Sequence, residues 1–197
     1  SALESGVFDE VVVSSDDPEI IEMAKRFGAT VPFVRPDHLS DDHTTTVEVL
    51  SHCLKWFESQ GKIVQSLACI YPVNPFLTAS LLQNAHNAWS NSDAQYCFSV
   101  SEFHSAPQRA LAMTEQGRIS SMDDRYRNTG TQDLEKAYFD AGMFYFFDSE
   151  ALKQGLPIYS EVSLPYVLPR HQAHDIDTED DWQYAEKVYR AFENDFR

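Results

Sequence analysis

Apolar residues along this chain fall into two kinds of pattern. Four short runs are apolar without alternation, as expected of strands buried on both faces of a sheet. We predict strands at residues 10–15, 66–70, 96–100 and 143–147, with a shorter extended segment at 31–34. Longer stretches between these runs place apolar residues three and four positions apart, which is typical of helices.

Boundary signals delimit the predicted helices. Asp16-Asp17-Pro18 predicts a helix start, and Gly28 predicts the end of the same helix. Leu3 to Gly6 has the character of a last helical turn that stops at a glycine. Three further helices, each with apolar side chains on one side, are predicted over residues 45–59, 78–89 and 178–192.

Strands that alternate with helices predict an α/β fold with a doubly wound, mostly parallel sheet, whose ligands bind at the carboxyl ends of the strands. We assign residues 1–197 to one domain of this kind. Residues 101–136 break the alternation because they are polar and poor in apolar runs, which favours a functional lobe or a subunit contact over a flexible excursion. Because the chain opens in a helical turn, we expect a first strand and loop to precede Ser1.

Charge restricts the possible partners. The 197 residues include 15 Lys or Arg and 31 Asp or Glu, a net charge of −16. Such a surface repels nucleic-acid backbones and anionic membranes, so we expect neither as a partner. No apolar run approaches the roughly 18 residues of a membrane span. Cys53, Cys69 and Cys97 lack CxxC spacing, which indicates free thiols in a reducing cytoplasm.

Asp175 and Asp177 are the strongest candidate for a metal site. If this segment is extended, both carboxylates project to the same side, and two carboxylates suit Mg²⁺ that also binds phosphate oxygens and water. The alternative is a helix start at which Asp181 completes a capping box around Thr178. The two interpretations are compatible, because capping uses Thr178 and the metal would use the aspartates.

Six motifs in order along nearly the whole chain resemble a known family. They are Val11 to Asp17, Arg35-Pro36 with Leu39 to Asp42, Tyr71 to Phe76, Thr131 to Gly142, Ser163 to Pro169, and Asp175 to Thr178. This order is similar to the cytidylyltransferases that activate nine-carbon, sialic-acid-like sugars, and most similar to their pseudaminic acid branch. The resemblance implies a Rossmann-like nucleotidyltransferase that uses CTP, a 2-keto sugar acid and Mg²⁺ to form a CMP-sugar and pyrophosphate.

The resemblance also implies site residues. It places Arg35, Asp42 and Thr46 at the nucleotide, and Asp175 and Asp177 at the metal and the catalytic centre. It places five residues at the sugar: Tyr71, Gln132, Tyr138, Asp140 and Gly142. Without it, Arg35 is a surface residue, Asp42 or Thr44 caps a helix, Tyr71 packs under its turn, and the others are polar loop groups. The family uses the region of residues 101–136 for homodimer contacts.

The chain departs from the family pattern in two places. The family begins with a strand and a Gly-rich, basic loop that grips the triphosphate, and here that segment would precede Ser1; we expect the chain alone to bind CTP poorly. The branch also tends to have Arg where this chain has Gly130, which would weaken contact with a sugar carboxylate. Three alternatives stay open: the same reaction on N-acetylneuraminic or legionaminic acid, a non-catalytic nucleotide- or sugar-binding remnant, and a metal-dependent glycosyltransferase.

Overall fold

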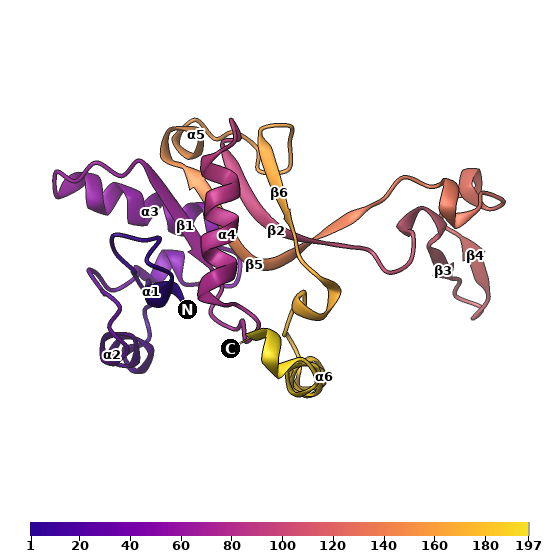
Figure 1. The fold of residues 1–197 in the computed structure, drawn as a ribbon, viewed down its shortest axis with the longest axis horizontal. Helices are drawn as coiled ribbons and strands as arrows, with labels where there is room; N and C mark the ends of the chain where they lie inside the picture. The colour runs from indigo at the N-terminus through magenta and orange to yellow at the C-terminus, as the bar shows by residue number, and fades with distance from the viewer. Residues whose placement is uncertain (197) are drawn as a thin grey trace.

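A four-stranded sheet lies at the centre of the computed structural model, which describes residues 1–196 (Figure 1). The strand order is β1–β5–β2–β6. Three strands run in one direction and β5 runs against them, because β5 is antiparallel to both β1 and β2 while β6 is parallel to β2. The elements are α1 (Ala2–Ser5), α2 (Pro18–Arg26), α3 (Thr46–Ser59), β1 (Ser66–Ile70), α4 (Ala79–Ser90), β2 (Tyr96–Glu102), β3 (Leu111–Met113), β4 (Ile119–Ser121), β5 (Tyr138–Asp148), α5 (Ser149–Lys153), β6 (Ser163–Val167) and α6 (Glu179–Ala191), with six short 3₁₀ turns between or after them.

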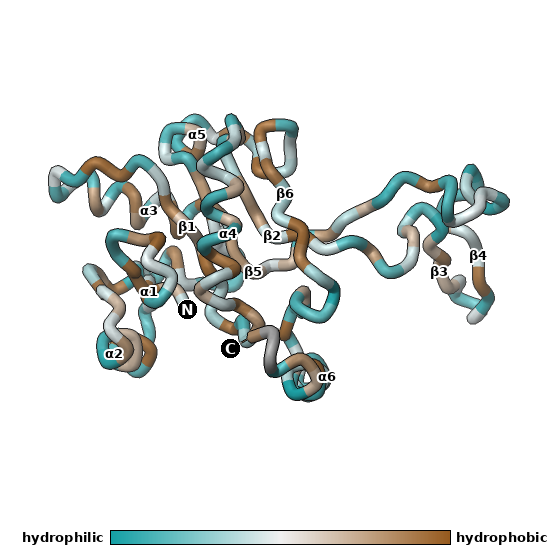
Figure 2. The backbone as a smooth tube through the Cα atoms, in the orientation of Figure 1, coloured by the Kyte–Doolittle hydropathy of each residue, from teal (hydrophilic) through white to brown (hydrophobic). Residues whose placement is uncertain are grey.

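Helices cover both faces of the sheet. Phe144 and Phe146 of β5 lie in a core with residues of α4 and α6, whereas Tyr145 and Phe147 lie in a second core with residues of α3 and α5. Successive residues of a strand point to opposite faces, so one strand contributes to both cores. Figure 2 shows that apolar segments follow the strands of the sheet. The predicted α/β fold with a mostly parallel sheet is confirmed.

Most predicted helix boundaries are confirmed by their caps. The Asp17 side chain accepts hydrogen bonds from the first backbone N–H groups of α2, and Thr78 and Thr178 cap α4 and α6 in the same way. The expected cap of α3 by Asp42 or Thr44 is wrong. Thr45 caps that helix in a capping box with Glu48. Across residues 1–196, every helix is too short or too polar to cross a bilayer.

The predicted strand at residues 10–15 is wrong in its extent. It is reduced to one parallel bridge between Val12 and Thr30, with hydrogen bonds from Thr30 N–H to Val11 O (2.8 Å) and from Val13 N–H to Thr30 O (3.0 Å). Pro32 follows two residues later and has no N–H to continue the ladder. The same proline explains why residues 31–34 form no strand.

β6 was not predicted from the sequence. Pro165 interrupts its apolar run and cannot donate to a ladder, which argues against a central strand. The structure places β6 at the edge of the sheet, where it pairs only with β2. A strand with one neighbour tolerates a proline whose missing N–H faces away from that neighbour.

Residues 103–137, between β2 and β5, form an arm that extends far from the rest of the chain (Figure 1). Its tip is the antiparallel pair of β3 and β4, in which Met113 lies opposite Ile119. Large apolar side chains of the arm are exposed: Leu111 63%, Met113 75%, Ile119 60% and Met122 68%. The arm thus presents an apolar surface that the body of the same chain does not cover.

Candidate active site

The candidate site begins with a mismatch between β2 and β5. Phe98 pairs with Tyr145 and Val100 pairs with Asp140, so the single residue Ser99 lies opposite four residues of β5, 141–144. Gly142 adopts φ 60°, a left-handed conformation in which other residues are strained. Such bulges bend a strand and redirect its side chains. Here the bulge determines where Asp140 points.

Ser99 supplies the hydrogen bonds that the bulge removes from the ladder. Its side chain is fully buried. The Ser99 Oγ accepts from Met143 N–H (3.1 Å) and Phe144 N–H (3.3 Å) and donates to Phe144 O (3.4 Å). Buried backbone groups need such partners, since leaving them unpaired costs free energy. Ser99 therefore holds the bulge in place.

The Asp140 carboxylate lies at the centre of a hydrogen-bonded cluster. Its Oδ2 accepts from the hydroxyls of Tyr145 (2.8 Å) and Tyr159 (2.7 Å), and its Oδ1 accepts from Gly142 N–H (2.9 Å). Tyr145 belongs to β5, and Tyr159 comes from the loop between α5 and β6. The Tyr159 ring meets Phe98 edge-on, with centroids 5.6 Å apart. Two separate segments thus converge on one carboxylate.

Both tyrosines keep their protons over a wide pH range. Burial, and then the hydrogen bond to Asp140, raise the pKa of the Tyr145 hydroxyl. For Tyr159, the hydrogen bond to Asp140 is the largest cause, followed by burial, and the pKa rises to about 12. A hydrogen bond donated by the neutral hydroxyl to a carboxylate disfavours loss of the proton. At neutral pH both phenols are therefore donors to Asp140.

Tyr71 joins the cluster from the turn after β1. Its ring meets the Tyr145 ring edge-on, with centroids 5.6 Å apart, and its hydroxyl lies 2.7 Å from the Thr46 Oγ1 at the start of α3. The Tyr71 N–H donates to Met143 O in the bulge (3.3 Å). The structure thus brings together four predicted site residues, namely Thr46, Tyr71, Asp140 and Gly142, although the prediction had divided them between nucleotide and sugar.

Asp175 and Asp177 lie in an extended segment before α6. Both are exposed, and Ile176 between them is half-buried against the core, so the two carboxylates lie on the solvent side. The predicted capping box is present: Asp181 Oδ2 accepts from Thr178 N–H (2.9 Å) and from the Thr178 hydroxyl. Over residues 1–196 no group of three His, Cys, Asp or Glu side chains is placed to hold a metal.

Two carboxylates alone fit a hard cation that takes its other ligands from water and substrate phosphates. Asp175 and Asp177 are such a pair, and the capping box fixes the backbone beside them without using their side chains. The segment also lies next to the turn after β1, because the ring of Phe76 packs against His174 with centroids 5.1 Å apart. The donor set is compatible with Mg²⁺.

Arg35 and Asp42 lie in the loop that precedes α3. The Arg35 Nε donates to Ser40 Oγ (3.1 Å), and its Nη2 pairs with Asp16 Oδ1 (3.3 Å). This arrangement holds the Arg35 side chain, which is 26% exposed, against the loop that precedes α3. Asp42 is exposed in the same loop, where Asp41, not Asp42, accepts from Thr44 N–H (2.7 Å).

Gln132 and Tyr138 belong to the arm and its base. Gln132 is exposed and donates from Nε2 to Asp133 Oδ2 (3.3 Å). Tyr138 is the first residue of β5 and is 44% exposed. Gly130 has an ordinary backbone conformation, and a side chain there would meet only the flexible end of Gln132. The structure of one chain therefore does not bring Gln132 to the Asp140 cluster.

Sequence reasoning missed Tyr145 and Tyr159. Tyr145 lies within the aromatic run Phe144 to Phe147, where a core position is the natural interpretation. Tyr159 lies 19 residues from Asp140 in a loop with no motif. Only the polar hydroxyl in an otherwise apolar strand could have drawn attention to Tyr145, since buried tyrosines usually find a hydrogen-bond partner.

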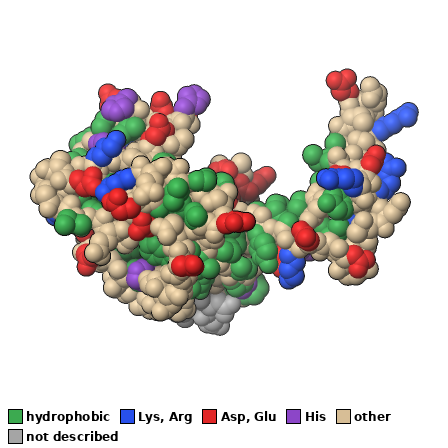
Figure 3. Space-filling view, turned by 90° about the horizontal axis from the view of Figure 1, so that it is seen from above, with side chains coloured by type: hydrophobic (Ala, Val, Ile, Leu, Met, Phe, Trp, Pro, Cys, Tyr) green, Lys and Arg blue, Asp and Glu red, His purple; other side chains and the backbone are tan. Residues whose placement is uncertain are grey.

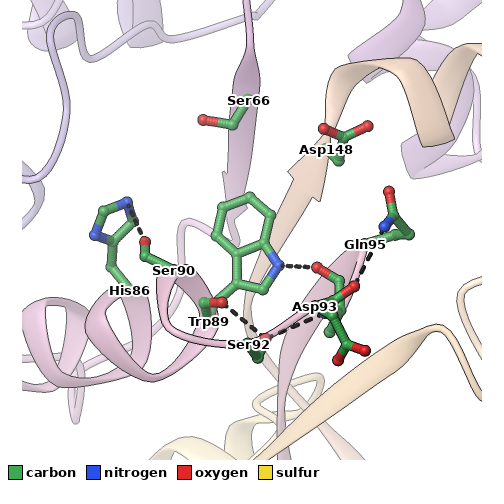
Figure 4. Close-up of a pocket in the computed structure, with 9 residues that line it drawn as sticks. Ser66, His86, Trp89, Ser90, Ser92, Asp93, Gln95 and Asp148 are labelled. Atoms are coloured by element: carbon green, nitrogen blue, oxygen red, sulfur yellow. Dashed lines mark hydrogen bonds between the residues drawn. The ribbon is translucent and has the colours of Figure 1, made fainter.

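A hollow of about 360 Å³ lies at the edge of the sheet opposite to the Asp140 cluster (Figure 4). It is bordered by Ser66 at the start of β1, Gln95 just before β2 and Asp148 at the end of β5. Its charged lining residues are Asp93 and Asp148, with no Lys or Arg among the nine. A hollow lined in this way repels a triphosphate, so it does not compete with the carboxyl edge as the nucleotide site.

Comparisons with known proteins identify the family of this chain. The model of the cytidylyltransferase family matches residues 1–194. A pseudaminic acid cytidylyltransferase from Campylobacter jejuni is 38% identical over 191 residues, which cover 97% of this chain and 82% of that protein. A CMP-N,N'-diacetyllegionaminic acid synthase from Legionella pneumophila is 26% identical, and the match covers 95% of this chain and 81% of that protein. The solved structure of CMP:2-keto-3-deoxy-manno-octonic acid synthetase, complexed with CTP, has the same fold, with a TM-score of 0.63 at 12% identity over 96% of this chain and 84% of that one.

Proposed function

Since the chain belongs to the cytidylyltransferase family and is a nucleotidyltransferase, we propose that it transfers CMP from CTP to the anomeric hydroxyl of pseudaminic acid. The hydroxyl oxygen forms a bond to the α-phosphorus, the bond to the β-phosphate oxygen breaks, and pyrophosphate leaves. The hydroxyl proton passes to water in the same reaction. Such chemistry depends on positioning and on neutralisation of phosphate charge more than on covalent help from the protein.

One observation carries the choice of substrate. The Campylobacter jejuni enzyme is 38% identical to this chain over 97% of its length. The Legionella pneumophila synthase is less similar. Tyr71, in the position where sialic-acid members of the family carry Gln, supports the same choice.

The proposed roles follow the positions of the residues. Arg35, Asp42 and Thr46, from the loop before α3 and its first turn, contact the nucleotide. Tyr71, Asp140 and Gly142 contact the sugar acid beside the bulge of β5. Gln132 contributes to sugar binding through the arm of a second copy, since the arm extends away from the rest of its own chain (Figure 1). Tyr138, two residues before Asp140 in β5, contributes from the base of the arm.

Asp175 and Asp177 are proposed to hold Mg²⁺, with Asp177 the more important ligand. When bound, the ion supplies positive charge against the triphosphate. The two aspartates orient that charge, because the capping box of α6 fixes the backbone on which they lie. Their own negative charge, on a chain at −16, makes a cation necessary before an anionic nucleotide can approach.

We propose a homodimer joined through the arm. Four large apolar side chains at its tip are at least 60% exposed, and burying each fully would contribute about 1.5–3 kcal/mol. The arm contains five Lys or Arg and five Asp or Glu, so the whole net charge of −16 belongs to the rest of the chain. Figure 3 shows several of these basic side chains on the arm. An arm with no net charge and an exposed apolar tip can approach a second copy without the repulsion that the acidic bodies experience.

We place the reaction in the cytoplasm. All three cysteines are free thiols, and burial raises the pKa of Cys69 and Cys97 to about 12. Buried free thiols of this kind are typical of proteins in reducing compartments.

The test is a turnover assay with CTP, Mg²⁺ and a panel of nine-carbon sugar acids. Pyrophosphate release measures the rate, and NMR identifies the product. We expect a CMP-sugar, with the highest kcat/KM for pseudaminic acid. A higher kcat/KM for N-acetylneuraminic or legionaminic acid would replace the proposed substrate. Absence of CMP transfer to every acid, even at CTP concentrations high enough to offset the weak binding expected of this chain, would overturn the proposed function.

A further inference from the structure

The cluster around Asp140 presents hydrogen-bond acceptors to a ligand. Both phenol protons, from Tyr145 and Tyr159, are donated to the Asp140 Oδ2, and Gly142 N–H occupies Oδ1. A carboxylate has about four acceptor sites, so three donors leave roughly one free. Each phenol oxygen that donates its proton can still accept. A ligand therefore meets lone pairs here and must supply the proton.

The cluster is reachable from solvent. Tyr159 is 73% exposed and Tyr71 is 36% exposed, whereas Tyr145 beneath them is 8% exposed. The hydrogen bond from the exposed Tyr159 crosses from the loop before β6 to the bulge of β5. The Phe98 ring supports it on one side. Asp140 is thus held from below by a buried phenol and at the surface by an accessible one.

Charge limits which ligand group can approach. Asp140 carries a full negative charge when ionised, on a protein with a net charge of −16. A carboxylate or phosphate brought to this acceptor would be repelled and would leave lone pairs facing lone pairs. The neutral donors on the two substrates are the hydroxyls and amide N–H groups of the sugar acid and the ribose hydroxyls and cytosine amino group of CTP. The proposed function places Asp140 beside the sugar acid, so the donor comes from that substrate.

We propose that Asp140, positioned by Tyr145 and Tyr159, recognises a hydroxyl or N-acylamide N–H of the sugar acid, and that the carboxylate of the acid and the triphosphate bind away from it. The inference rests on the proposed function and adds two points to it. Asp140 determines which sugar acid is accepted, because a substrate that lacks the donor leaves the remaining acceptor site of this half-buried carboxylate unpaired and binds less well. Tyr145 and Tyr159 are positioning residues that act through Asp140.

The experiment measures KM separately for the sugar acid and for CTP, each at saturating co-substrate, by pyrophosphate release. Asp140→Asn should raise KM for the sugar acid about 10- to 100-fold, as expected for loss of a hydrogen bond to a charged group, and leave KM for CTP within about twofold. Tyr159→Phe removes only an accessible hydroxyl and should raise the same KM roughly 3- to 10-fold. The control is Tyr96→Phe, which removes a tyrosine hydroxyl that donates to Leu156 O (3.0 Å) and not to Asp140, and should change neither KM.

A second readout uses nonulosonic acids that differ in one hydroxyl or N-acylamino group. The wild-type protein should discriminate between at least one such pair about 10-fold or more, and Asp140→Asn should lose most of that discrimination. An unchanged KM for the sugar acid in Asp140→Asn, or an equal rise in KM for CTP, would overturn this inference while the proposed function stands. A wild-type protein that transfers CMP to none of the acids would overturn the proposed function and this inference with it.

Discussion

Ser99→Ala tests whether the bulge of β5 depends on one buried hydroxyl. The substitution removes the acceptor of Met143 N–H and Phe144 N–H, neither of which has a ladder partner opposite Ser99. A buried N–H left unpaired costs about 1–3 kcal/mol, so two cost about 4 kcal/mol in the free energy of unfolding. For a chain of 197 residues this corresponds to a fall in Tm of roughly 8–16 °C.

The chain offers a matched control. Ser101 lies two residues further along β2, is equally buried, and donates a single hydrogen bond from its Oγ to Leu168 O (3.3 Å). Ser101→Ala removes one donor and leaves a carbonyl, which is less costly than two orphaned N–H groups, and we expect a loss of about 1 kcal/mol.

Thermal and urea unfolding, followed by circular dichroism, give the two losses directly. We also expect Ser99→Ala to raise KM for the sugar acid. The Gly142 N–H lies in the bulge and bonds Asp140, so a change in the bulge shifts the Asp140 carboxylate. If Ser99→Ala is no less stable than Ser101→Ala, then the bulge is held by something other than Ser99, and the account of how Asp140 is oriented is incorrect.

The remaining predictions address the metal, the arm and the thiols. Asp177→Asn should abolish CMP transfer with an unchanged Tm, and Asp175→Asn should lower transfer less severely. Normal Mg²⁺-dependent turnover in Asp177→Asn would contradict the metal assignment. Met113→Glu should give a monomer by light scattering at micromolar concentration. The control Ser120→Glu, on the other face of the hairpin, should stay a dimer. A monomeric wild type would exclude the arm dimer. Because the pKa of Cys69 and Cys97 is about 12 in the folded protein against an ordinary value of 9, their contribution to stability should be full below pH 9 and fall as pH rises towards 12, which urea unfolding across this range measures.

The helices could be predicted because their signals are local. Asp17 before Pro18, and Thr178 three residues before Asp181, specify helix starts that the structure confirms. Strands were harder, because whether an extended run pairs depends on distant residues. Residues 10–15 have the composition of a strand but form only one β-bridge. β6 contains a proline, which disfavours a strand, but its edge position tolerates that proline.

The site could be predicted only in part, for the same reason. The family resemblance implies that Tyr71, Asp140 and Gly142 contact the sugar, which stays a prediction. The place where these three residues come together depends on the mismatch between β2 and β5, which no local pattern shows. Tyr159 reaches Asp140 from a loop whose sequence gives no indication of it. Composition predicted an acidic chain but not that the arm is neutral, since that follows from where the basic residues lie.

The position of β5 has a consequence for how the chain folds during synthesis. In the four-stranded sheet, as described, β1 pairs only with β5, and β2 pairs with β5 and β6. No two strands of this sheet can therefore pair until β5, which begins at residue 138, has been made. The ribosome adds about 5–20 residues per second, so β1 waits roughly 4–16 s for the end of β5, with the whole arm synthesised in between. Long-range pairing of this kind slows folding. Nascent chains that end before residue 138 should therefore depend on chaperones to protect the apolar strands β1 and β2.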